Sequence, residues 1–398
     1  MERLGILYYV TSFPKLSESF VLNEIRELKH RGHNVAVFAL DNPSEEITHE
    51  EYRNISVPTY YADVSYIDAH SILSITSIKM AIKYGNSSLL SQLSTKSIVY
   101  SLVLGRLCSD FINSLDFDID VIHGHFADSS KGGEILAARN HQVSCTVTAH
   151  AAEIFKNPNH QKTRFICDNV DHVIVPSDYN RQYLSEEAGV SNEMTVVPAT
   201  SSTEKFGPSA PTVENRLLTV ARLVEKKGYK FAIKAVKELV DRGYDIEYHI
   251  IGSGDLEGEL QQQVEKYGIK DHVKFLGHVS DEVLRQELSE ACVFLLPCVI
   301  AENGDRDAMP VALKEAMASE TACVSTTVSA IPELITHGRD GLLVAPRETE
   351  ELANAVNNLL DNPDRRRELA GNGRETVNNK FDIKDSVQTL VDVFYIIK

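Results

Sequence analysis

The sequence predicts an α/β protein built from two doubly wound domains. Short apolar runs alternate with helix-length amphipathic segments along all 398 residues, and most of the apolar runs are continuous. Continuous apolar runs are typical of parallel strands that helices cover on both faces. A chain of this length also exceeds one ordinary hydrophobic core, which favours two domains.

The expected elements repeat as strand, helix and strand in each half of the chain. Strands are predicted in the first half at Gly5–Val10, Asn34–Leu40, Val121–His125, Cys145–Ala149, His172–Pro176 and Met194–Pro198. Strands are predicted in the second half at Leu217–Ala221, Tyr248–Gly252, Val273–Leu276, Val293–Leu296, Ala322–Ser325 and Gly341–Val344. The helices between them include Glu18–Arg31, Tyr229–Arg242, Leu256–Tyr267 and Leu352–Asp361.

The domain boundary is expected near residues 198–211, where the chain is small, polar and proline-bearing, as suits a linker. We therefore assign residues 1–200 to an N-terminal domain and residues 201–381 to a C-terminal domain. Open α/β sheets bind ligands outside the carboxyl ends of their strands. The residues that follow each strand are thus the candidates for function.

Composition excludes several classes of protein. A hydrophobic content of 43% with 24% charged residues indicates a globular chain, and a net charge of −17 disfavours nucleic-acid partners. The six cysteines include no C-x-x-C pair, so they are expected to be reduced core residues of a cytoplasmic protein. No apolar run approaches the ~20 residues of a membrane span. The segment Tyr66–Leu107 favours helical packing, with amphipathic helices that touch a membrane or lipid acceptor as the alternative.

Two cations follow the first strand of the second half. Arg222 comes directly after Leu217–Ala221, and Lys227 comes five residues later, just before Gly228. Together they could clamp a diphosphate and neutralise a departing phosphate. The alternative is a pair of solvent-exposed loop residues.

Two carboxylates bracket a helix start after the strand Val293–Leu296. Pro310 suits the first helical position, so the helix is expected to begin at about Met309 with Asp307 before it. The free N–H groups of this end, around Met309 and Val311, attract anions such as phosphate. Glu315 would lie roughly 9 Å along the helix at 1.5 Å per residue. The alternative is that Asp307 caps the helix and Glu315 is a solvated helix residue.

Gly252-Ser253-Gly254 follows another strand, where glycines let the backbone approach a ligand closely. The pattern also suggests a dinucleotide site, but the acidic residue that this site needs at the end of the next strand is absent. That strand ends in Gly277-His278 instead.

Three further positions are candidates. His150 ends a strand, where it could donate to a sugar hydroxyl or serve only as a structural histidine. His123 and His125 lie on one strand face, but no third ligand is near in sequence, so we expect no metal. Glu333 lies near a helix start and could contact a ribose or sugar, or be an ordinary first-turn carboxylate.

Taken together, these residues resemble the retaining glycosyltransferases of family 4, which have the GT-B fold of two Rossmann-like domains facing across a cleft. In the second half the likeness rests on segments 220–228, 250–254, 273–277, 307–318, 331–334 and 340–344. In the first half it rests on segments 13–20, 123–127 and 148–150, which resemble the branch that builds exopolysaccharides and other surface glycans. The fold implies that the last helix, within residues 382–398, crosses back to the first domain.

The resemblance also implies roles for individual residues. Arg222 and Lys227 would bind the donor diphosphate, and backbone N–H groups around Met309 to Ala312 would meet its phosphate. Asp307 would lie near the donor sugar, Glu315 on the ribose, and His150 beside the anomeric carbon. Two departures from the family pattern are Asp307 in place of Glu and Ala308 in place of Gly.

The function expected is therefore a cytoplasmic hexosyltransferase (EC 2.4), free of metal and cofactors and placed at the inner face of the cell membrane in one version of the hypothesis. It would move a sugar from a nucleotide-sugar to a glycan or lipid-linked glycan. The alternatives are a catalytically silent sugar-nucleotide-binding subunit and an NAD(P)-dependent oxidoreductase.

Overall fold

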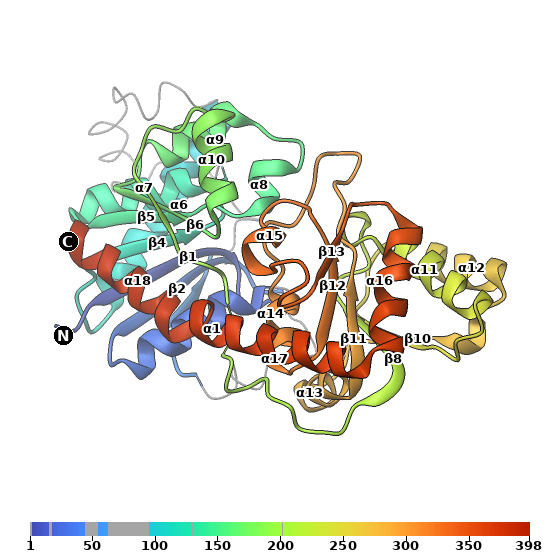
Figure 1. The fold of residues 1–398 in the computed structure, drawn as a ribbon. Coiled ribbons are helices and arrows are strands. Elements are labelled where there is room, and N and C mark those ends of the chain that lie inside the picture. Colours follow the sequence, from blue (N-terminus) through green and yellow to red (C-terminus); the bar gives the residue numbers. More distant parts are fainter. Residues whose placement is uncertain (1, 16–17, 44–54, 63–94, 129, 201) are drawn as a thin grey trace. The chain divides into compact units, whose positions relative to one another are not determined.

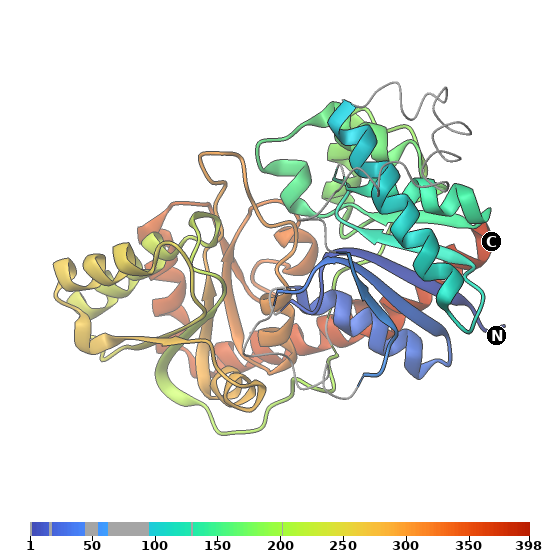
Figure 2. The same cartoon turned by 180° about the vertical axis from the view of Figure 1, so that it is seen from behind.

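The structure is a computed structural model that describes residues 2–15, 18–43, 55–62, 95–128, 130–200 and 202–398. It divides into two compact units, which Figures 1 and 2 show from opposite sides. Unit 1 comprises Met1–Pro198 together with Val387–Lys398, and unit 2 comprises Ala199–Ser386. Each unit contains one parallel sheet, and we describe each unit by itself.

The sheet of unit 1 has seven strands in the order β3-β2-β1-β4-β5-β6-β7, all parallel. The strands are β1 (Gly5–Ser12), β2 (Asn34–Asp41), β3 (Thr59–Tyr61), β4 (Val121–His125), β5 (Ser144–Thr148), β6 (His172–Val175) and β7 (Met194–Val196). The helices are α1 (Ser19–His30), α6 (Thr95–Ser114), α7 (Lys131–His141), α8 (Ala151–Phe155), α9 (His160–Cys167) and α10 (Asp178–Glu186).

Helices cover both faces of this sheet. The apolar residues Val21, Leu22, Ile25 and Leu28 of α1 recur at helical spacing and are buried. Helix α18 (Ile383–Ile397) runs from unit 2 into unit 1. It lies in front of the sheet of unit 1 in Figure 1, whereas α6 lies in front of that sheet in Figure 2. The end of α18 is tied to the start of the chain, because Lys398 Nζ lies 3.2 Å from Glu2 Oε1.

The sheet of unit 2 has six strands in the order β10-β9-β8-β11-β12-β13, again all parallel. The strands are β8 (Val213–Val220), β9 (Glu247–Ile251), β10 (Val273–Gly277), β11 (Ala291–Leu296), β12 (Ala322–Thr326) and β13 (Leu342–Val344). The helices are α11 (Tyr229–Asp241), α12 (Glu257–Tyr267), α13 (Asp281–Glu290), α14 (Val311–Ala318), α15 (Ile331–Leu334), α16 (Thr349–Asp361) and α17 (Pro363–Lys380), with short 3-10 turns η3 (Glu225–Lys227) and η4 (Lys270–His272).

Both sheets reverse their strand order at one point. In unit 1 the chain starts at β1, moves outward to β3 and then returns to β4 on the other side of β1; in unit 2 β8 and β11 have the same relation. In a doubly wound sheet the loops on either side of such a switch point diverge and leave a crevice at the carboxyl ends of the strands. The loops after β1 and β4, and after β8 and β11, are therefore where ligands are expected.

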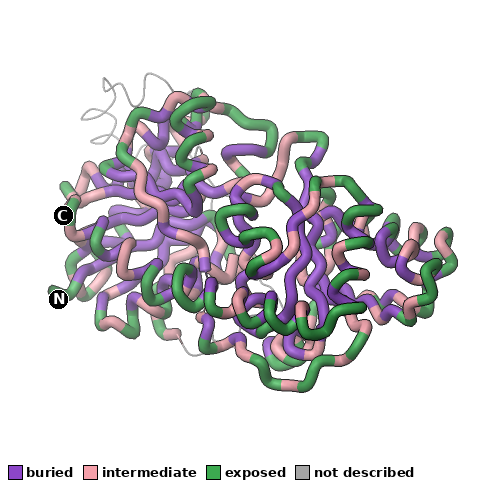
Figure 3. The backbone as a smooth tube through the Cα atoms, in the orientation of Figure 1, coloured by how far each residue is buried: buried purple, intermediate pink, exposed green. Residues whose placement is uncertain are grey.

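The α/β fold class predicted from sequence is confirmed. Each of the twelve predicted strands is present, with ends that differ by a few residues, and the sequence reading missed only the short edge strand β3 among the described strands. The strands of both sheets form the buried interior in Figure 3. All six cysteines are buried and unpaired, as expected. Among the helices that the structure describes, none has the length and apolar character needed to cross a bilayer.

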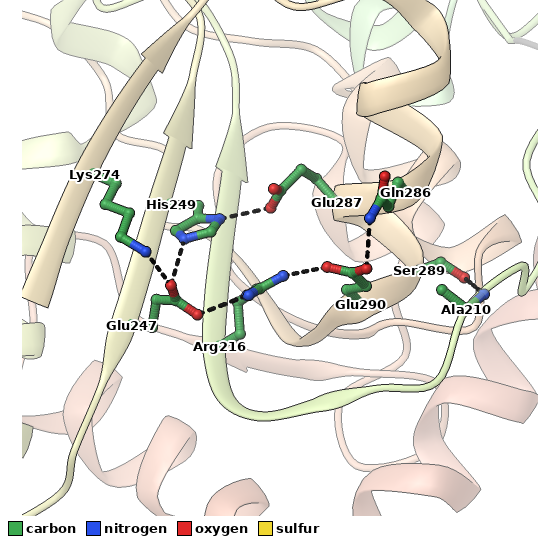
Figure 4. A network of polar contacts seen from close by, with 9 residues as sticks. All are labelled: Ala210, Arg216, Glu247, His249, Lys274, Gln286, Glu287, Ser289 and Glu290. Carbon is green, nitrogen blue, oxygen red and sulfur yellow. Dashed lines mark hydrogen bonds and ion pairs between the residues drawn. The ribbon is translucent and has the colours of Figure 1, made fainter.

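A polar network fixes the amino-terminal side of the second sheet (Figure 4). His249 of β9 lies between Glu287 of α13, at 2.6 Å, and Glu247, at 3.1 Å. Arg216 of β8 lies 2.9 Å from Glu247, which also pairs with Lys274 of β10. Burial works to raise the pKa of Glu247, but the bonds from Lys274, Arg216 and His249 outweigh it and lower the pKa to about 2. This network ties three strands to α13 at the start of β9, away from the carboxyl ends.

Candidate active site

The candidate site of unit 2 is formed by loops that meet at the carboxyl edge of the sheet. Gly228, between η3 and α11, has φ 72°, and a Cβ there would lie 1.8 Å from the carbonyl oxygen of Pro297. Only glycine allows this approach. The N–H of Val299 also donates to the carbonyl of Lys226 at 2.9 Å. The loop after β8 is thus fixed against the loop after β11.

Two lysines and two aspartates form a cluster between these loops. Lys227 Nζ lies 2.5 Å from Asp307 Oδ2. Lys226 Nζ lies 2.9 Å from Asp305 Oδ1 and 3.3 Å from Asp307 Oδ1. The charges of this cluster sum to zero, which is how charged side chains can be buried together. Sequence reasoning assigned Asp307 to the donor sugar but missed its partnership with Lys226, because isolated spacing does not show that the two loops meet.

The ion pairs shift the pKa values of Asp307 and Lys226 in opposite directions. Burial works to raise the pKa of Asp307, but the ammonium groups of Lys227 and Lys226 outweigh it and hold the pKa well below its usual range. Burial works to lower the pKa of Lys226, but Asp307 and Asp305 outweigh it and raise the pKa. The thiol of Cys298 lies 3.7 Å from Asp307 Oδ2, and burial followed by that carboxylate raises its pKa. Asp307 and Lys226 are therefore both charged at neutral pH.

Helix α14 begins at Val311, two residues later than predicted. Pro310 has ψ 127°, which is not helical, so it occupies the N-cap rather than the first helical position. Among the described residues, no side chain caps this end. Asp307 therefore does not cap the helix. The N–H of Leu313 donates to the carbonyl of Pro310 at 3.3 Å, and the N–H groups of Val311 and Ala312 are left for another acceptor. Met309 is buried, Val311 is half-buried, and Glu315 is a half-buried residue of the second turn.

The remaining candidates of unit 2 differ in exposure. Arg222 is exposed, and its guanidinium makes no hydrogen bond or ion pair with another described residue. Glu333 is exposed in the first turn of α15. A hydrogen bond of 3.1 Å from the N–H of Ala330 to the carbonyl of Ala308 brings α15 to the loop that carries Asp307. The structure therefore places these loops on one edge, although it does not bring Arg222 into the lysine–aspartate cluster.

Close packing of the backbone requires glycine at positions 252 and 254, which the sequence reading did not foresee. A Cβ on Gly252 would lie 2.1 Å from the carbonyl oxygen of Ala221, and one on Gly254 would lie 2.6 Å from that of Leu223. The N–H of Leu223 donates to the carbonyl of Ser253 at 2.9 Å. These glycines let the loop after β9 pack on the loop that carries Arg222, which explains them without a ligand.

The candidate site of unit 1 lies at the switch point between β1 and β4. His150 is the second residue after β5 and is buried, with the rings of Phe20 and Phe126 against it at centroid distances of 4.8 and 4.6 Å. The carboxylate of Glu153 accepts the N–H of His150 at 2.6 Å and the N–H of Ala127 at 2.9 Å. The backbone at His150 is therefore fixed to the chain that follows β4.

A second set of contacts reaches His150 from the side chains of β4 and α1. His125 Nδ1 lies 2.9 Å from His150 Nε2, and His125 Nε2 lies 3.2 Å from Glu24 Oε2. The hydroxyl of Tyr8 donates to the same oxygen of Glu24 at 3.1 Å. All of these side chains are buried. The sequence reading missed Glu24 entirely, because only the fold brings α1 onto the end of β4.

Glu24, His123 and His125 also place polar atoms within 4.8 Å of one another, as a metal site would. The partner that was missing from the H-x-H sequence is thus supplied by α1. The two nitrogens of His123 lie 2.8 Å from Thr146 Oγ1 and 3.3 Å from Thr148 Oγ1. Since His123 and Glu24 have protein partners, the residues describe a hydrogen-bonded cluster and we assign no metal to it.

The segment Tyr66–Leu107 lies for the most part outside the described residues, which resume at Thr95 with α6. Two residues of the 13–20 segment, 16 and 17, also lie outside them.

Comparison with known proteins agrees with this architecture. Residues 200–376 match the family model described as glycosyl transferases group 1, and residues 17–204 match that of glycosyltransferase family 4. The amylovoran biosynthesis glycosyltransferase AmsK of Erwinia amylovora is 30% identical over 376 residues, covering 88% of this chain and 89% of that protein. The putative colanic acid biosynthesis glycosyltransferase WcaL of Salmonella typhimurium is 26% identical over 380 residues, with the same shares.

Solved structures share the fold over the whole chain. A glycosyltransferase from Rickettsia africae superposes with a TM-score of 0.75 at 13% identity, covering 100% of this chain and 99% of that chain. Anabaena HepE in complex with UDP and glucose gives a TM-score of 0.75 at 15% identity, covering 99% of this chain and 100% of that chain. The GT-B fold expected from the sequence is therefore confirmed.

Proposed function

Because the chain belongs to glycosyltransferase family 4, we propose that it transfers a sugar from a nucleotide-sugar donor to a glycan or lipid-linked glycan, and that it retains the anomeric configuration. The enzyme class is EC 2.4. The names of its relatives, in amylovoran and colanic acid biosynthesis, support an exopolysaccharide as the product. Its six buried, unpaired cysteines support a cytoplasmic setting.

The observation that carries this proposal is the lysine–aspartate cluster beside the uncapped end of α14. A diphosphate needs cations and N–H donors, and both lie at the switch point of unit 2. Lys226 compensates the charge of Asp307, so Lys227 can exchange its contact with Asp307 for one with a phosphate oxygen. We assign Arg222, which is exposed, to the same diphosphate.

The sugar and the nucleoside would lie on either side of the diphosphate. Asp307 is held in place by two lysines, so its carboxylate can accept from a donor-sugar hydroxyl at a fixed position. We assign Glu315 to the ribose and Glu333 to a further donor contact. The backbone N–H groups of Met309 and Val311 would meet the phosphate, whereas Pro310 has no N–H and only terminates the loop.

The chemistry proposed is substitution on one face of the sugar. As the bond to the diphosphate breaks, negative charge grows on the leaving phosphate, and Lys227, Arg222 and the α14 end stabilise it. The departing phosphate oxygen takes the proton of the acceptor hydroxyl, which then attacks from the same face. Each well-placed charged donor is expected to contribute about 3 kcal/mol to the transition state, or about 100-fold in rate.

Unit 1 would contribute His150. Its position at the carboxyl end of β5, fixed by Glu153 and faced by two aromatic rings, supports a contact with the sugar beside the anomeric carbon. Burial, followed by the neighbouring His125, lowers the pKa of His150 well below its usual value. His150 is therefore neutral at physiological pH and can act as a hydrogen-bond donor or acceptor, not as a cation.

A thermal-shift screen against UDP-, GDP-, ADP- and CMP-sugars tests the proposal. A ligand that binds only the native protein stabilises it by about 2.7 kcal/mol at 100 times its Kd. We expect sugars of one nucleotide to raise the Tm, and the anomer formed on an acceptor from that donor to match the donor. Stabilisation by NAD(H) or NADP(H) without any effect of the nucleotide-sugars would favour the oxidoreductase instead. Donor binding without hydrolysis or transfer would indicate the silent subunit.

A further inference from the structure

Three buried polar side chains of unit 1 form a linear series of contacts that ends at His150. Tyr8 of β1 donates to Glu24 of α1 at 3.1 Å, Glu24 lies 3.2 Å from His125 Nε2, and His125 Nδ1 lies 2.9 Å from His150 Nε2. His125 Nε2 is buried and is not yet aligned with the Glu24 oxygen. Such contacts are often loosely aligned in enzymes before the substrate binds.

Each contact in this series determines which nitrogen of the next imidazole carries the proton. A neutral imidazole has one N–H and one lone pair, so a bond at one nitrogen fixes the role of the other. When Glu24 accepts from His125 Nε2–H, His125 Nδ1 must accept from His150 Nε2–H, which leaves a lone pair on His150 Nδ1. When Glu24 is protonated and donates to His125 Nε2, both bonds at His125 reverse and His150 Nδ1 carries the proton, while Tyr8 still donates to Glu24.

The surroundings allow both arrangements near neutral pH. Burial raises the pKa of Glu24 to about 7, with His123 and Tyr8 working in the other direction. Burial, and then Lys131, lowers the pKa of His125 to about 3, so His125 carries no charge. Lys131 of α7, Asp128 and Glu153 of α8 also face this region, and burial raises the pKa of Glu153 to about 8. Glu153 accepts from the backbone N–H of His150, whereas Glu24 contacts the imidazole of His125, so the proton on Glu24 sets the direction of the bonds between the rings.

We propose that Glu24 and His125 are positioning residues that hold His150 and set which of its nitrogens carries the proton. This rests on the proposed function in that His150 contacts the sugar. The tautomer then decides whether Nδ1 of His150 donates to a sugar hydroxyl or accepts from it. Neither Glu24 nor His125 touches the reacting atoms.

The test is ¹⁵N NMR of the histidine side chains in the full-length protein between pH 6 and pH 8.5. The signal of His150 is identified by its loss in H150N. We expect the population of its two tautomers to differ between the wild type and E24Q, and the pH dependence near 7 to disappear in E24Q. The control is E27Q, on the same helix, where Glu27 pairs with Arg31 at 2.8 Å; it should match the wild type.

A second variant guards against misfolding. H125N keeps an amide near the Nδ1 position but removes the contact with Glu24. Its control is H172N, because His172 is also buried and its Nε2 lies 2.8 Å from Thr195 Oγ1 at the start of β6. H125N should change the His150 tautomers, whereas H172N should not. Identical tautomer populations in wild type, E24Q and H125N at every pH would overturn the proposal. A stoichiometric metal ion in the purified protein would also overturn it, because the metal would occupy His125 Nε2.

Kinetics separate this inference from the proposed function. E24Q should lower kcat about 10- to 100-fold through misplacement of His150 while the donor KM changes little. If the tautomers change as expected but the wild type transfers no sugar from any donor, the proposed function fails and the positioning of His150 stands. If transfer occurs but the tautomers never change, the proposed function stands and the positioning role of Glu24 and His125 fails.

Discussion

The replacement of Lys226 by Met tests the charge balance of the cluster in unit 2. The wild-type cluster holds two ammonium groups and two carboxylates, and the side chain of Lys226 is 6% exposed. Without Lys226, Asp305 loses its ammonium partner and Asp307 keeps its contact with Lys227. Removing one partner of a buried pair costs about 3 kcal/mol, which is about 6–12 °C in Tm for a unit of this size.

The assay is thermal unfolding at pH 7 followed by circular dichroism. The matched control is Lys237→Met, because Lys237 pairs with an aspartate on the surface of α11 and such pairs contribute about 0–1 kcal/mol. The double variant Lys226→Met/Asp305→Asn restores the charge balance and should recover part of the loss. A Tm for Lys226→Met within 1–2 °C of the control would refute the reasoning, since a compensated buried cluster cannot lose one charge freely.

Three further predictions follow from the same unit. Glu315→Ala should weaken the binding of the free nucleoside diphosphate while the fold survives, and wild-type affinity by calorimetry would refute the ribose assignment. Gly228→Ala should destabilise unit 2 by at least about 2 kcal/mol in chemical unfolding, because the strained φ and the clash with Pro297 add up. Its control is Gly243→Ala, which has φ 93° but open space around it and should lose only about 1 kcal/mol. The pKa of Asp307 is below its unfolded value near 3.8, so this carboxylate stabilises the fold above that pH and the contribution is lost as the pH falls. Between pH 5 and 2.5, the free energy of unfolding of Asp307→Asn should therefore depend less steeply on pH than that of the wild type.

The sequence predicted the framework well because the parallel strands are continuous apolar runs. Val293–Leu296, for example, is buried in β11 on both faces, and such a run has few other interpretations. The edge strand β3 was missed because its three residues, Thr59–Tyr61, are only half-buried and carry no pattern of their own. Pro310 was placed one position too far into α14 because proline fixes φ but leaves ψ free, and its ψ here is extended.

The site was harder to predict because its contacts join residues that are far apart in sequence. Arg222 and Lys227 could be assigned from their place after β8, but the contact of Lys226 with Asp307 depends on the approach of Gly228 to Pro297. Glu24 gave no signal at all, since a carboxylate on an amphipathic helix is usually solvated. Only the strand order of the sheet brings that helix to the end of β4.

The central claim is that Lys227 and the end of α14 bind the diphosphate of a nucleotide-sugar. Its most direct test is calorimetry of the nucleoside diphosphate that the thermal-shift screen identifies, with the wild type, Lys227→Ala and Lys230→Ala. Lys230, three residues later, pairs with Glu259 on the surface and serves as the control. The account predicts that Lys227→Ala raises the Kd by at least about 10-fold, or about 1.4 kcal/mol, while Lys230→Ala binds as the wild type does. Equal affinity for all three proteins would contradict it.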